Sequence, residues 1–104
     1  MFGCHWKANK EVTFTTFQEV EDFIHSAKVD DFFCMDSAIY STLFQAKRRR
    51  KGWQVEWQHH YIHWQFKLLG CSNERLIELM RVYVEKGFVP LQTMANWQFV
   101  DIRD

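Results

Sequence analysis

Residues 52–70 read GWQVEWQHHYIHWQFKLLG and carry the clearest secondary-structure pattern in the chain. Its letters alternate, so that Trp53, Val55 and Trp57 fall on one side of an extended chain and polar residues fall on the other. After a short interruption the apolar side resumes at Ile62. Period-two alternation on both sides of a short break predicts a β-hairpin.

The segments before this hairpin contain a helix signal between strand signals. Thr16 followed three residues later by Glu19 is a capping-box pattern, and the apolar residues after it recur at helical spacing. Alternating letters on either side of the helix indicate strands, with Asp36-Ser37 as a break. The predicted elements are a hairpin within 2–15, a helix over 17–27, and strands over 31–35 and 39–47.

A second helix is predicted after the hairpin, capped by Ser72 or Asn73 and ended by Gly87. Its charged residues form one stripe, and apolar residues occupy the rest of its surface. Residues 88–91 and 97–102 look extended. The last segment has apolar residues on both faces, which predicts an interior strand covered on both sides.

Together these elements predict an α+β fold. We expect a mainly antiparallel sheet of about five to seven strands, with a central meander and two helices packed on one face. A chain of 104 residues with a single proline is expected to form one globular domain over 1–104. Its aromatic content of 17% is more than one small core is expected to hide.

The net charge is zero, but acidic and basic residues are segregated along the chain. The segment from Glu11 to Asp36 carries seven acids and one cation, Lys28. A basic run follows immediately before the central hairpin; this run, KRRRK, is called the pentad and comprises Lys47, Arg48, Arg49, Arg50 and Lys51. It is interpreted either as a solvated turn that protects a sheet edge or as an anion-binding tip.

The polar side of the hairpin is the other candidate surface. It carries glutamines and Glu56 together with Tyr61 and His63, on the sheet face that the helices leave open. That face is either simply solvated or a recognition platform. The predicted partner-binding residues are the pentad, His59, Tyr61 and His63.

Metal binding, cofactors and catalysis are not indicated by the sequence. His59 and His63 share a strand face but lie about 13 Å apart at about 3.3 Å per residue, too far for shared coordination. No nucleotide-binding or zinc-finger spacing is present. No spacing brings a nucleophile to a base, so we expect a non-enzymatic protein without cofactor or metal.

Cysteines 4, 34 and 71 are odd in number, far apart in sequence and in no CxxC spacing. This usage is typical of reduced thiols that pack as small apolar residues. The sequence contains neither a signal-peptide pattern nor a membrane-span pattern. We therefore expect a cytoplasmic protein with no membrane contact.

These properties are typical of a protein that binds another macromolecule. The first hypothesis is a protein-protein interaction module of the inhibitor, immunity or antitoxin kind, which uses charge complementarity and Trp, Tyr or Arg anchors. The alternative is single-stranded nucleic-acid binding through the Lys47–Lys51 tip, with exposed aromatic rings stacking on bases. Either hypothesis is compatible with a homodimer.

Overall fold

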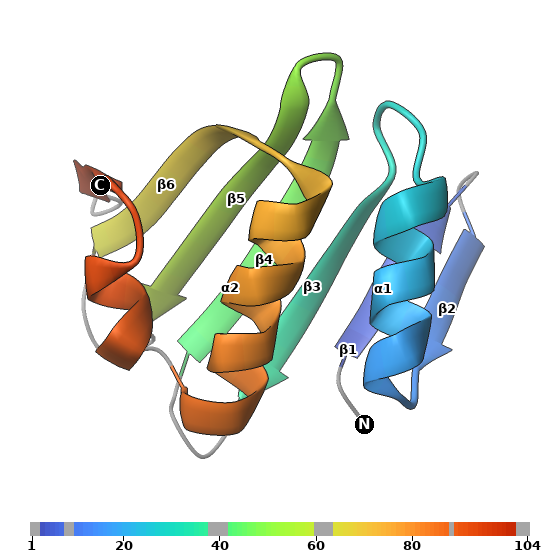
Figure 1. The fold of residues 1–104 in the computed structure, drawn as a ribbon, viewed down its shortest axis with the longest axis horizontal. Helices are drawn as coiled ribbons and strands as arrows, with labels where there is room; N and C mark the ends of the chain where they lie inside the picture. Colours follow the sequence, from blue (N-terminus) through green and yellow to red (C-terminus); the bar gives the residue numbers. More distant parts are fainter. Residues whose placement is uncertain (1–2, 8–9, 38–41, 60–63, 88, 102–104) are drawn as a thin grey trace.

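The computed structural model describes residues 3–7, 10–37, 42–59, 64–87 and 89–101. The described residues form one antiparallel sheet of seven strands in the order β2-β1-β3-β4-β5-β6-β7, and α1 and α2 lie over the same face of it (Figure 1). The predicted α+β architecture is confirmed. The elements are β1 Gly3–Lys7, β2 Lys10–Phe14, α1 Phe17–Ser26, β3 Phe32–Ser37, β4 Thr42–Arg49, β5 Gly52–His59, β6 Trp64–Cys71, α2 Asn73–Lys86, the 3-10 helix η1 Val89–Thr93 and β7 Gln98–Asp101.

The predicted central hairpin is confirmed as β5 and β6. Trp53, Val55 and Trp57 are buried beneath the helices, while the residues between them lie on the opposite face of the sheet. The ring of Trp57 stacks on Phe66 with 4.0 Å between ring centroids. Large flat rings on neighbouring strands therefore form the centre of the core.

A β-bulge interrupts the hairpin near its start. Trp53 pairs with Cys71 and Val55 pairs with Leu68, so two residues of β6, Leu69 and Gly70, stand opposite Gln54. The extra residue keeps both Trp53 and Cys71 buried on the helix face despite the change of register.

The helices begin where their capping residues predict. The Thr16 hydroxyl accepts a hydrogen bond from the Glu19 amide at 3.2 Å, and the Ser72 hydroxyl accepts one from the Arg75 amide at 3.1 Å. The hydroxyl of Thr15 donates to the Glu19 carboxylate and lowers the pKa of that group below its ordinary 4.5. The apolar stripe of each helix packs on the sheet, as predicted.

The chain differs from prediction near its C-terminus. Residues 89–93 form a 3-10 helix where an extended segment was predicted for 88–91, and Pro90 lies in its first turn. Strand β7 pairs with β6 at the edge of the sheet, so the prediction of an interior strand is wrong. Phe99 is 67% exposed there.

Candidate partner-binding face

The pentad does not form a single tip. Lys47, Arg48 and Arg49 continue strand β4, and only Arg50 and Lys51 occupy the turn into β5. Strand alternation then divides the strand residues between the two faces of the sheet. Lys47 and Arg49 lie on the face opposite the helices, which we call the open face.

The acidic segment meets the basic pentad within the molecule. The carboxylate of Asp30 lies 3.9 Å from the Lys47 ammonium and 3.9 Å from the Arg49 guanidinium. Two backbone hydrogen bonds keep these two segments together. The Asp30 amide donates to the Arg48 carbonyl at 2.9 Å, and the Arg48 amide donates to the Asp31 carbonyl at 2.8 Å. One acid of the acidic segment therefore pairs with cations of the basic pentad inside the same molecule.

A tight turn brings Asp30 to this position. The Asp31 side chain is buried and accepts a hydrogen bond from the Lys28 amide at 2.9 Å, while the Asp31 amide donates to the Lys28 carbonyl at 3.0 Å. Asp30 itself has a φ of 78°, a left-handed conformation that Asp tolerates better than most residues. The turn between α1 and β3 and the turn between β4 and β5 lie at the same end of the sheet (Figure 1).

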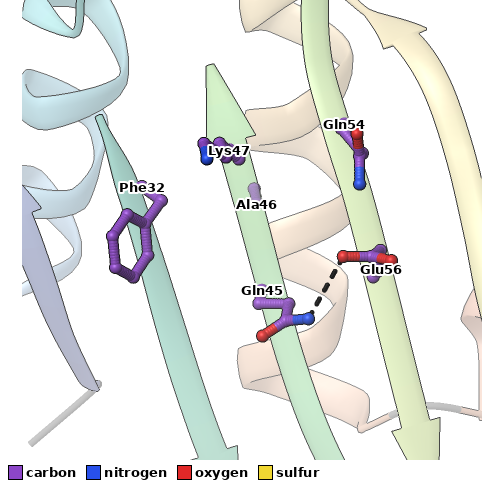
Figure 2. Close-up of a pocket in the computed structure, with 6 residues that line it drawn as sticks. All are labelled: Phe32, Gln45, Ala46, Lys47, Gln54 and Glu56. Carbon is purple, nitrogen blue, oxygen red and sulfur yellow. Dashed lines mark hydrogen bonds between the residues drawn. The ribbon is translucent and has the colours of Figure 1, made fainter. Parts of the chain in front are cut away.

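The open face is hollowed beside these cations. A shallow pocket of about 190 Å³ is lined by residues of three strands: Phe32, Gln45, Ala46, Lys47, Gln54 and Glu56 (Figure 2). The residues Phe32, Lys47 and Gln54 stand in one cross-strand row. In the next row, the side-chain amide of Gln45 donates to the Glu56 carboxylate at 3.1 Å (Figure 2). This hydrogen bond joins two of the residues that line the pocket.

Exposed apolar side chains surround the same end of the sheet. Val29 is 50% exposed in the turn before β3, Phe32 is 36% exposed on the open face, and Leu69 is 58% exposed in the bulge opposite Gln54. Sequence reasoning missed all three. The run Phe32-Phe33 contained a usable signal, because two neighbouring strand residues point to opposite faces and only one can face the helices.

The pentad and His59 do not come together. His59 ends β5, whereas Lys47 and Arg49 stand opposite Gln54 and Gly52, five and seven residues before it. At about 3.3 Å per residue, these two cations are about 17 and 23 Å from His59 along the sheet. Tyr61 and His63 lie outside the described residues, as do any contacts across the tip of the β5-β6 hairpin.

The tryptophans of β5 are unavailable for stacking on a ligand. Trp53 is 0% exposed and Trp57 is 1% exposed. The indole N–H of Trp53 donates to the side chain of Asn73 at 2.8 Å, which ties the start of α2 to the sheet. Among the described residues around the pentad, Phe32 is the exposed aromatic residue that a partner could contact.

Within the described part of the chain, no three His, Cys, Asp or Glu side chains come close enough together to hold a metal ion. No described helix is both long and apolar enough to cross a membrane. Comparisons of the chain with protein-family models, with curated proteins and with solved structures find no match. Any functional argument therefore depends on the surface itself.

Proposed function

We propose that this protein is a small non-enzymatic module that binds an acidic surface of another protein, in the manner of inhibitor, immunity or antitoxin proteins. The binding surface is one end of the open face and the turns beside it. We call it the basic end, and it comprises Val29, Phe32, Lys47, Arg49, Arg50, Lys51 and Leu69. The observation that carries the proposal is that exposed apolar side chains and unburied cations gather at this one end of the sheet.

The composition of the basic end suits a protein interface. Such interfaces combine apolar anchors with polar rims in which Arg is enriched. Phe32 and the neighbouring pocket supply a place where an anchor fits, and Arg50 and Lys51 supply exposed charge. Phe32, Lys47 and Arg49 are on paired strands, so little backbone conformational entropy is lost at these positions when a partner binds.

The charges favour an acidic partner over a basic one. Asp30 offsets Lys47 and Arg49, but the remaining cations of the pentad still give this end an excess of positive charge. Complementary charge accelerates association and suppresses wrong partners. One acid of α1, by contrast, is engaged within the fold: the half-buried Glu21 pairs with Arg81 of α2 at 2.6 Å.

The test uses two matched pairs of variants as baits in extracts of the native host at low salt. Lys51→Glu reverses a charge in the basic end, and Lys86→Glu makes the same reversal at the last residue of α2, at the other end of the sheet. Phe32→Ser removes an exposed apolar side chain from the basic end, and Val89→Ser removes one from η1.

We expect an acidic protein to be retained in stoichiometric amounts by the wild type, Lys86→Glu and Val89→Ser. With the purified partner, Lys51→Glu and Phe32→Ser should each weaken binding about tenfold. The proposal fails if no stoichiometric partner is recovered, or if the partner binds all four variants equally.

The same experiment separates the nucleic-acid alternative. If retention depends on nucleic acid, treatment of the extract with nuclease removes the bound protein from every bait. Two observations weigh against this alternative: the β5 tryptophans are buried, and a carboxylate lies among the cations that would contact phosphates.

A further inference from the structure

Two of the three cysteines stand directly opposite each other in the sheet. Strand β1 pairs with β3 in antiparallel register, with Cys4 opposite Cys34, His5 opposite Phe33 and Trp6 opposite Phe32. The sequence separates the two cysteines by the whole of β2 and α1. Their pairing is therefore a product of the fold and is invisible in the cysteine spacing.

The register meets the backbone requirement for a disulfide. Residues directly opposite in an antiparallel pair have Cα atoms about 4.5 or 5.5 Å apart, depending on the hydrogen-bonding position. Disulfides span Cα separations of about 4.4–6.8 Å, so both kinds of position satisfy the backbone requirement. Cys34 is half-buried on the open face and is thus within reach of small oxidants.

We propose that Cys4 and Cys34 form a cross-strand disulfide when the protein meets hydrogen peroxide. The Cys34 thiolate attacks one peroxide oxygen, the O–O bond breaks, and a sulfenic acid and hydroxide result. The Cys4 thiolate then attacks the sulfenic sulfur, the S–S bond forms and a second hydroxide leaves. The two protons from the thiols convert both hydroxides to water. Two thiols are oxidised by two electrons, and one peroxide is reduced.

Cys71 provides an internal contrast. It is 4% exposed beneath the helices, and burial raises the pKa of its thiol to about 11, against a smaller opposing effect of Arg75. At neutral pH it holds almost no thiolate, the form that reacts with peroxide. The third cysteine is thus a core residue.

The disulfide would link β1 covalently to β3, near the N-terminal edge of the sheet. It closes a loop of about 30 residues that contains β2 and α1, and a loop of this length gives a large reduction of unfolded-state entropy. We expect oxidation to raise the melting temperature by about 10 °C or more. A disulfide that is partly accessible is also open to thiols, so dithiothreitol should reverse the effect.

The test treats the full chain with equimolar hydrogen peroxide and measures intact mass, peptide linkage and melting temperature. The wild type should lose the mass of two hydrogen atoms as a monomer, show a Cys4–Cys34 linked peptide, and melt higher until it is reduced. Cys71→Ala should behave in the same way. Cys4→Ser and Cys34→Ser should each lose both the linkage and the thermal shift.

Three results would overturn the proposal. The first is recovery of three alkylatable thiols in the monomer after treatment. The second is a linkage that involves Cys71 or joins two chains. The third is a Cys4–Cys34 bond that lowers the melting temperature, because the paired strands would then be forced apart. None of these results depends on whether the basic end binds a partner.

Discussion

Gly52, at the start of β5, is tightly constrained by its own backbone conformation and by its neighbours. It follows the two-residue turn at the end of the pentad and has a φ of 121°, a conformation that residues with a Cβ rarely adopt. A Cβ at this position would lie 2.8 Å from the backbone oxygen of Cys71 and 3.0 Å from the carbonyl carbon of Gly70. Gly70 lies in the bulge of β6 and Cys71 follows it, so the absence of a Cβ at Gly52 lets the backbone of β5 approach the backbone of β6 closely.

Replacing Gly52 should therefore destabilise the protein more than replacing its neighbour Gly70. Gly52→Ala is expected to cost about 2 kcal/mol or more, because both its φ and its contacts with backbone are unfavourable. Gly70 also has a left-handed φ, of 70°, but a Cβ there would make only an ordinary contact, 3.8 Å from the Lys51 carbonyl oxygen. Gly70→Ala should therefore cost about 1 kcal/mol. Urea unfolding followed by the fluorescence of the buried tryptophans measures both. Equal costs would show that the contact with β6 is unimportant.

At the scale of elements, a buried pair of hydroxyl groups joins the middle of the sheet to α2 within the apolar core. The hydroxyls of Thr42 on β4 and Tyr83 on α2 are 2.8 Å apart, and both residues are buried. The Tyr83 hydroxyl also lies 3.4 Å from the Thr42 carbonyl oxygen, and its ring packs against Phe44 at 5.3 Å. A buried hydroxyl that loses its partner retains its desolvation cost, so the pair fixes how α2 lies across β4.

A double-mutant cycle tests this contact. Tyr83→Phe should destabilise the protein by about 1–2 kcal/mol, because it leaves the Thr42 hydroxyl buried without that partner. Thr42→Val should cost less, since the Tyr83 hydroxyl keeps the Thr42 carbonyl within reach. The double variant should cost about 1 kcal/mol less than the sum of the single changes. Additive costs, measured by urea unfolding, would contradict the coupling.

The elements that were predicted well are those whose signals are local. The capping residues Thr16 and Ser72 and the alternation around Trp53 specify their elements within a few neighbouring positions. The errors concern segments whose state depends on distant partners. Phe99 is an example: its alternation fits a strand, but only the sheet order reveals that this strand lies at an edge.

At the scale of the whole molecule, the segregated charges of the sequence are brought together by the fold. The turn after α1 places Asp30 beside Lys47 and Arg49, although 17 and 19 positions separate them along the chain. The cations of the candidate site could be predicted, because the pentad is a continuous basic run in the sequence. Its division between strand and turn, its ion pairs and its exposed Phe32 depend on tertiary pairing that no local pattern encodes.

This arrangement predicts weak, non-specific binding to nucleic acid. A net charge of zero and an internal carboxylate leave few cations to neutralise phosphates, so few counterions are released on binding. We expect a labelled single-stranded oligonucleotide to bind the wild type only weakly, even at about 50 mM salt, with a shallow dependence on salt. Fluorescence anisotropy measures this. Tight binding that Ala at positions 48, 49 and 50 abolishes would favour the nucleic-acid alternative over the protein-binding proposal.

The strand order also has a consequence for how the chain assembles. Strands β3, β4, β5 and β6 are neighbours in both sequence and space, so their pairing closes short loops. The pairings at either side are different: β1 reaches β3 across β2 and α1, and β7 reaches β6 across α2 and η1. Because these two pairings close longer loops, each costs more chain entropy than a pairing within the β3–β6 meander. We therefore expect the four-stranded meander to form first, and β1 and β7 to pair with it later.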